Sequence, residues 1–311
     1  MCKCILNREY YALKEIPKYN LFLYNRMYSI LKEPNCLHKL NKYDFVPKII
    51  SSFQDYEHFY LVTTFFEGQS LNFLKSDKLT EEQIKFVCAC VIQSLLYLRK
   101  EKIIHRDIMM KNIVMGNDKY FNLIDFTYSI KYLEKRNNKH NMITYNRVTP
   151  PEMYYNNSEY DYNSDYYRLG SVIYYLIFKK YPYTIKKEKK INEVFTEYKG
   201  ISNYSFSCID FMNKLLIANY RKRIGFKDIK ELIKHNWFKD FDWKKLEKRK
   251  IKSPFKFYKN ELKKSSCSNH KLIIERIRKF KKLSKLNIYQ KLADKFEYVN
   301  KDIANNILKN Y

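Results

Sequence analysis

The sequence predicts an α+β protein with two lobes, a small N-terminal lobe rich in β-strands and a larger helical C-terminal lobe. The chain has 311 residues, of which 45% are hydrophobic and 17% aromatic, so it can bury a substantial core. Strand-forming residues gather in 10–13 and 60–62, whereas apolar residues recur at helical spacing in 86–98 and helical patterns continue over 165–245. A strand-rich beginning followed by a helical remainder favours two unequal lobes.

The lobes are expected to meet where the strand pattern ends. We assign residues 1–66 to the N-terminal lobe, residues 67–245 to the C-terminal lobe, and residues 246–311 to a basic, Lys-rich tail that we expect to be helical. Near the start of the C-terminal lobe, Thr80 and Gln83 have the spacing of a capping box, which predicts the beginning of a long buried helix.

The chain is strongly basic, with a net charge of +27 because 60 Lys and Arg outnumber 33 Asp and Glu. The excess is spread along the whole sequence, so we do not expect a nucleic acid partner. No apolar stretch reaches the roughly 20 residues that a membrane span requires, and the N-terminus lacks the apolar core of a signal peptide. We therefore expect a cytoplasmic or nuclear protein with reduced cysteines.

Three polar residues at fixed spacing carry the main functional signal. Asp107 and Asn112 are 5 positions apart, Asn112 and Asp125 are 13 apart, and a hairpin is predicted over residues 112–124. A strand lysine precedes these three residues. Asp107 ends a His-Arg-Asp sequence and Asp125 begins an Asp-Phe pair, and a Pro-Pro-Glu sequence and a late arginine follow them. In this order and spacing, residues 10–238 resemble the eukaryotic protein kinase superfamily and its two-lobed fold.

The resemblance implies ATP-dependent transfer of a phosphoryl group to serine or threonine hydroxyls of protein substrates, with Mg²⁺ as the metal. It makes Asp107 the group that accepts the proton of the substrate hydroxyl. It makes Asn112 and Asp125 the metal-binding residues, since Mg²⁺ prefers oxygen ligands.

Lys14 ends a strand and, by the same resemblance, is the catalytic lysine that holds the ATP phosphates and pairs with a helix glutamate. Glu33 is our candidate for that glutamate, 19 positions further along. Pro34 follows it directly and would disturb a helix interior. A competing register places Met27 at this position, and the absence of any pair is the third alternative.

The resemblance also implies where the adenine ring of ATP binds. It places Ala12 above the ring and Val114 below it, with backbone groups of Thr64 and Phe66 along the edge of the slot.

Two further motifs have structural roles by resemblance. Glu152 and Arg223 are expected to form a buried ion pair. Asp165 is expected either to cap a helix or to tether the loop that contains Asp107.

The segment 229–255 is similar to the end of the AGC group of kinases, which includes the cyclic-nucleotide-dependent kinases, so we expect an AGC-like serine/threonine kinase.

The sequence departs from the family pattern at three places. No glycine precedes Lys14, so we expect an N-terminal lobe without the first strand and the glycine-rich loop. Either the chain is N-terminally truncated, or the phosphates of ATP lie open. Met109 replaces a lysine that contacts the transferred phosphate, and Lys111 is the nearby cation. Thr127 replaces the glycine of Asp-Phe-Gly and is expected to restrict that segment. These departures leave a pseudokinase, acting as a nucleotide-binding, scaffolding or allosteric module, as the alternative.

Residues near the predicted site suggest the partners. Lys111 and Ser70 stand where kinases that prefer basic substrates carry acidic residues, so we expect acidic or neutral protein substrates. Arg106 is able to pair with a phosphate on the activation segment, which predicts an activating kinase and makes Thr144 and Tyr145 the candidate acceptors.

Overall fold

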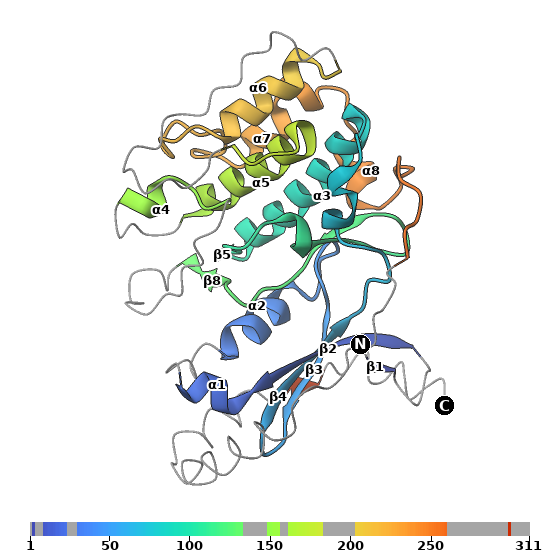
Figure 1. Cartoon of the computed structure of the whole chain (residues 1–311), viewed down its shortest axis with the longest axis vertical. Helices are drawn as coiled ribbons and strands as arrows, with labels where there is room; N and C mark the ends of the chain where they lie inside the picture. The colour runs from blue at the N-terminus through green and yellow to red at the C-terminus, as the bar shows by residue number, and fades with distance from the viewer. Residues whose placement is uncertain are drawn as a thin grey trace. The chain divides into compact units, whose positions relative to one another are not determined.

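The structure is a computed structural model and describes residues 2–3, 9–23, 30–132, 148–155, 161–182, 203–259 and 298–299. The chain forms two compact units, drawn in Figure 1. Unit 1 comprises Met1–Lys42, Pro47–Phe66 and Asn260–Tyr311, and unit 2 comprises Tyr43–Val46 and Glu67–Lys259. Unit 2 thus takes in a short stretch of the expected N-terminal lobe and extends beyond residue 245.

Unit 1 contains an antiparallel sheet of five strands, in the order β1-β2-β4-β3-β9. The strands are β1 (Cys2–Lys3), β2 (Tyr10–Pro17), β3 (Ile49–Gln54), β4 (His58–Thr64) and β9 (Tyr298–Val299). Figure 1 shows β2, β3 and β4 side by side, and the longest ladder runs from Tyr11 opposite Thr64 to Pro17 opposite His58. This ladder fixes the register of the strand that carries Lys14.

In the part of unit 1 that the structure describes, two helices accompany this sheet, α1 (Lys18–Leu23) and α2 (Lys32–Leu40). Helix α2 contacts β3 and buries Cys36, Leu37 and Leu40. Pro34 is the third residue of α2 and therefore lies in the first turn, where the missing N–H of proline costs no intrahelical hydrogen bond. The proline therefore does not disturb the helix that carries Glu33.

Unit 2 is mainly helical. Its helices are α3 (Glu81–Lys100), α4 (Glu152–Tyr155), α5 (Tyr162–Phe178), α6 (Phe206–Leu215), α7 (Lys230–Lys234) and α8 (Trp243–Glu247), with short 3-10 helices η2 (Leu71–Ser76), η3 (Met110–Asn112) and η5 (Asn236–Phe238). Two antiparallel strand pairs complete it: β5 (Ile103–Ile104) with β8 (Ile130–Lys131), and β6 (Ile113–Met115) with β7 (Phe121–Leu123). The second pair is the predicted hairpin, and it begins directly after Asn112.

The core of unit 2 forms around α3 and α5, which pack on each other. Thr80 and Gln83 make both bonds of the predicted capping box at the start of α3, and most residues of that helix are buried. Helix α5 also packs on α6 through Gly170, where a Cβ atom would lie 2.8 Å from the Cβ of Leu215. Only glycine permits this approach, so a larger residue at 170 would force the two helices apart.

The described part of the predicted helical tail is not helical beyond Glu247, so that expectation is wrong for residues 248–259. This segment lies along unit 2 because its backbone and side chains are bound there. The Tyr120 hydroxyl donates to the Ile251 carbonyl at 2.6 Å, and the buried Phe255 ring contacts Phe121 edge-on. Tyr298–Val299 form strand β9, and the remaining tail residues lie outside the described residues.

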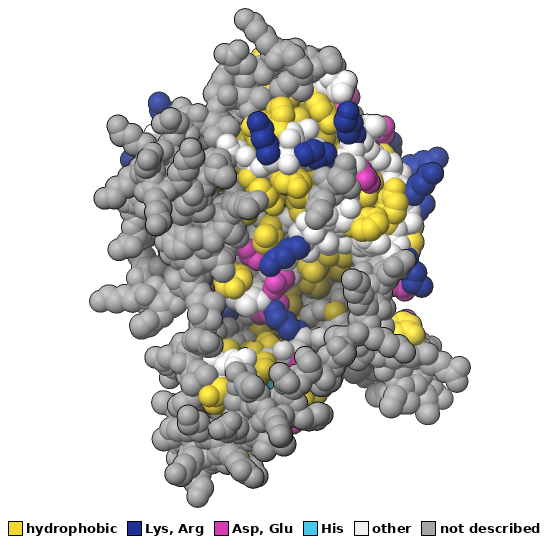
Figure 2. All heavy atoms as spheres, in the orientation of Figure 1, with side chains coloured by type: hydrophobic (Ala, Val, Ile, Leu, Met, Phe, Trp, Pro, Cys, Tyr) yellow, Lys and Arg dark blue, Asp and Glu magenta, His cyan; other side chains and the backbone are white. Residues whose placement is uncertain are grey.

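Each helix in the described part of the chain is either too short or too polar to span a lipid bilayer. On the face drawn in Figure 2, described Lys and Arg side chains lie as separate groups among neutral and hydrophobic ones. This view shows no single basic patch over the described atoms.

Candidate active site

The loop that contains Asp107 is tethered by a buried carboxylate. Asp165, in the first turn of α5, accepts hydrogen bonds from the backbone N–H groups of His105 and Arg106, both at 2.8 Å. Burial raises the pKa of Asp165, while these backbone bonds oppose that rise. The cap of α5 is Asp161, so of the two predicted roles for Asp165 the structure supports the tether.

The imidazole of His105 joins this loop to the segment around Asp125. Its Nδ1 accepts from the Asp107 backbone N–H at 3.2 Å, and its Nε2 lies 3.2 Å from the Ile124 carbonyl oxygen. Burial lowers the pKa of His105 despite the carboxylates nearby. A neutral ring with its proton on Nε2 satisfies both contacts, and the ring also packs edge-on against Phe126.

Asp107 and Asn112 are held together by the Asn112 amide. Its Nδ2 donates to the Asp107 backbone oxygen at 2.8 Å and to the Asp107 carboxylate oxygen Oδ2 at 2.9 Å, and both side chains are buried. Since both amide protons are used on Asp107, Oδ1 is the Asn112 atom suited to a cation. The Asn112 carbonyl accepts from the Ile124 N–H at 2.8 Å, which brings the residue preceding Asp125 next to Asn112.

Asp125 has a left-handed backbone conformation, with φ of 66°. Its Oδ1 accepts from the Thr127 hydroxyl and from the Thr127 N–H, the latter at 3.4 Å. The positive φ thus falls on Asp125 and not on Thr127, so Thr127 does not have to adopt the backbone angles that favour glycine.

In unit 1, Lys14 and Glu33 form an ion pair with Nζ and Oε2 2.7 Å apart. The Glu33 side chain is 11% exposed and the Lys14 side chain 38%. Of the three alternatives for the partner of Lys14, which were Glu33, Met27 and none, the structure has Glu33. Met27 lies outside the described residues.

The predicted adenine contacts divide between the units. Ala12, Thr64 and Phe66 are partly buried residues of unit 1, where Ala12 lies opposite Thr63 in the sheet. Val114 is a partly buried residue of unit 2 and forms a β-bridge with Ser70. An adenine slot formed by these residues stays a prediction.

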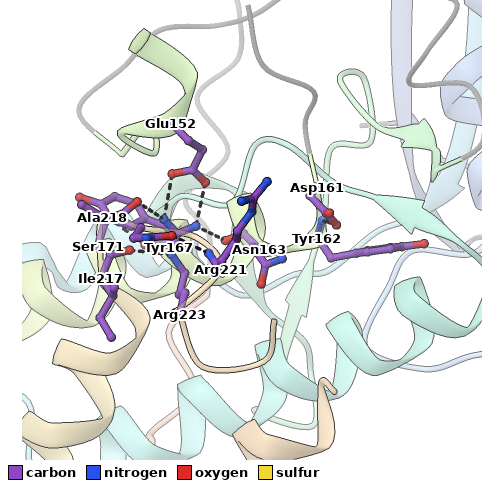
Figure 3. Close-up of polar contacts among 11 residues, drawn as sticks. Glu152, Asp161, Tyr162, Asn163, Tyr167, Ser171, Ile217, Ala218, Arg221 and Arg223 are labelled. Carbon is purple, nitrogen blue, oxygen red and sulfur yellow. Dashed lines mark hydrogen bonds and ion pairs between the residues drawn. The ribbon is translucent and has the colours of Figure 1, made fainter. Parts of the chain in front are cut away.

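The predicted pair of Glu152 and Arg223 is present and bidentate (Figure 3). Both of its nitrogen–oxygen distances are 2.8 Å. The remaining donors of Arg223 reach the carbonyl oxygens of Asn163 at 2.7 Å, Ile217 at 3.0 Å and Ala218 at 3.4 Å. All five N–H groups of the guanidinium therefore have acceptors, which is the condition for burying this cation.

Comparison with known proteins identifies the family. Residues 1–238 match the family model described as the protein kinase domain. The chain belongs to the protein kinase family. The polar residues described above occupy the motif positions on which the sequence resemblance was based.

Curated kinases are between 25% and 29% identical to this chain over the aligned residues. Serine/threonine-protein kinase sgk-1 of Caenorhabditis elegans is 27% identical over 253 residues, covering 80% of this chain and 54% of that protein. The cAMP-dependent protein kinase catalytic subunit of Schizosaccharomyces pombe is 29% identical over 261 residues (80% and 49%), and the cGMP-dependent protein kinase isozyme 2 of Drosophila melanogaster is 25% identical over 256 residues (79% and 27%). The chain thus spans about half the length of these relatives or less. Their names confirm the AGC-like assignment.

Protein kinases use ATP with a divalent metal, and the donor atoms found here suit that metal. Within the described ranges, no group of three or more His, Cys, Asp or Glu side chains could hold a metal ion. Asn112 and Asp125 nevertheless offer hard oxygen donors, and an Mg²⁺ site in a kinase is completed by substrate phosphates and water. The donor set therefore fits.

Two contacts of the site do not follow from the sequence motifs alone. One is the bridge that the His105 imidazole makes to residues 124–126. The other is the bond from the Thr127 hydroxyl to Asp125. A hydroxyl two residues after an aspartate is a signal for a local side-chain hydrogen bond and could have indicated the second contact.

Proposed function

We propose that this chain transfers the terminal phosphoryl group of ATP to serine or threonine hydroxyls of protein substrates. The observation that carries the proposal is the buried amide of Asn112, which binds both the backbone and the carboxylate of Asp107. A carboxylate held in this way suits the task of receiving a substrate hydroxyl. The names of the curated relatives support the same reaction.

Each group has a defined task in this proposal. Asp107 orients the substrate hydroxyl and takes its proton, and Asn112 keeps Asp107 in place while offering Oδ1 to Mg²⁺. Asp125 would offer its carboxylate to the divalent metal. Lys14, oriented by Glu33, binds the ATP phosphates. Mg²⁺, when bound, neutralises charge on the phosphate oxygens.

Substrate charge forms the second part of the proposal. Lys111, next to Asn112, is exposed, and Ser70 is partly exposed beside Val114. Neither side chain attracts a basic residue of a substrate, and Lys111 attracts an acidic one. The proposed substrates are therefore acidic or neutral around the acceptor, which the net charge of +27 also favours.

The test is phosphate transfer from radiolabelled ATP to three peptides that differ only in acidic, neutral or basic residues around one serine. Asp107→Asn and Asp125→Asn should each reduce transfer by at least about 100-fold. Asp240→Asn, at an exposed position of unit 2, is the matched control and should leave the rate unchanged. Lys111→Glu should raise the relative rate on the basic peptide.

Two results would overturn the proposal. If the wild-type chain transfers no phosphate, or if transfer survives both active-site substitutions, the reaction is not performed by these residues. If the wild-type chain prefers the basic peptide, the substrate class is wrong while the reaction stands.

A further inference from the structure

Residues 124–129 are bound to the loop at residues 105–107 by several contacts within unit 2. Arg106 Nε donates to the Tyr128 carbonyl at 2.6 Å, and the Ser129 hydroxyl donates to the His105 carbonyl at 3.3 Å. The buried Phe126 ring packs on the His105 ring. These contacts hold the backbone next to Thr127 in place, so the bonds between Thr127 and Asp125 form within an ordered segment.

Thr127 is exposed, and both its hydroxyl and its N–H donate to the same carboxylate oxygen, Oδ1 of Asp125. A side chain at this exposed position has no role in packing the core. Aspartate is one of the few residues that adopt a positive φ readily, because its side chain bonds locally. Asp125, with φ of 66°, uses this property to direct its carboxylate toward Thr127.

We propose that Thr127 is a positioning residue for the divalent cation of the phosphoryl-transfer reaction. Its hydroxyl holds the Asp125 carboxylate in one orientation, so that the cation meets a preorganised ligand. This inference rests on the proposed function, because it takes Asp125 as a metal ligand. A carboxylate has about four lone-pair positions, so the bonds to Thr127 leave the group able to bind a cation.

The hydroxyl of Thr127 can affect cation binding in two ways that make contrary predictions. If the hydroxyl only withdrew charge from the carboxylate, removing it would strengthen cation binding. If it orients the carboxylate, removing it weakens binding, because the cation must then order a side chain that was held before.

The experiment measures cation affinity without relying on turnover. Mn²⁺ is titrated into the full chain at saturating ADP, and free Mn²⁺ is followed by electron paramagnetic resonance. Thr127→Val keeps the shape and β-branch but removes the hydroxyl, whereas Thr127→Ser keeps the hydroxyl. Asp125→Asn serves as the reference for loss of the ligand, and melting temperatures verify that all variants are folded.

Thr127→Val should raise the Mn²⁺ dissociation constant about three- to tenfold, and Thr127→Ser should stay within about twofold of wild type. Unchanged or tighter binding in Thr127→Val would overturn the inference, as would an equal loss in the serine variant. If wild type itself retains no Mn²⁺ in the presence of ADP, the proposed function fails and this inference fails with it. Intact binding in wild type and in both threonine variants rejects the inference alone.

Discussion

Replacing Glu152 by alanine should destabilise unit 2 by about 3–5 kcal/mol, because it leaves a buried cation incompletely paired. The Arg223 side chain has no exposed surface, and that of Glu152 is 11% exposed. Glu152→Ala removes the acceptors of two of the five donors of Arg223. Each buried donor without an acceptor costs about 1–3 kcal/mol, so the sum agrees with the value for breaking a buried ion pair.

Glu152→Gln gives an intermediate case, since its amide oxygen still accepts one bond while its NH₂ group faces the guanidinium. Its expected cost is about 1–3 kcal/mol, which keeps the test informative if the alanine variant fails to fold.

The assay is urea unfolding followed by circular dichroism, with comparison of the unfolding midpoints at constant slope. Glu67→Gln is the control, because its 3.8 Å contact with Lys259 is exposed at the lysine end and should be worth less than about 0.5 kcal/mol. A loss below about 1 kcal/mol in a folded Glu152→Ala would refute the argument.

Two further predictions concern the site. Glu33→Ala should raise the KM for ATP about three- to tenfold, because Lys14 then loses the carboxylate that orients it. The same change should cost less than about 1 kcal/mol of stability, because Lys14 is partly exposed. An unchanged KM in steady-state kinetics would count against the phosphate-binding role of the pair. Because burial lowers the pKa of His105, the unfolded chain binds this proton at a higher pH than the folded chain, so stability falls as the pH drops below about 6.5. Between pH 7 and 5.5, wild type should therefore lose more stability than His105→Gln in urea unfolding, and parallel pH profiles would contradict this.

Much of the fold could be predicted because the relevant signals are local. The capping box at Thr80 and the apolar period after it are properties of one helix, and both bonds of that box are present. The turn between β6 and β7 is likewise determined by a few neighbouring residues. The segment 248–259 was mispredicted because a Lys-rich amphipathic pattern favours a helix, whereas partners more than 100 positions away, such as Tyr120, hold it in another conformation.

The site was predictable to the extent that its residue types are dictated by chemistry. The resemblance to protein kinases implied the roles of Asp107, Asn112 and Asp125 in phosphoryl transfer, and the bonds of Asn112 and Asp165 show how the loop is held. The hydroxyl two positions after Asp125 indicates a local bond to that aspartate, but the positive φ at Asp125 that accompanies it is not specified by the sequence motif.

Two of the three departures from the family pattern, Met109 and Thr127, differ in burial from the motif residues that the chain keeps. Met109 is partly buried and Thr127 exposed, whereas His105, Asp107 and Asn112 are buried and joined by hydrogen bonds. Changing a buried member would leave donors or acceptors without partners, and such a change costs far more than one at the surface. Met109 and Thr127 therefore lie outside this buried network, and the arrangement that holds Asp107 stays intact. This is why both are expected to tune metal and phosphate binding rather than to remove the capacity for transfer.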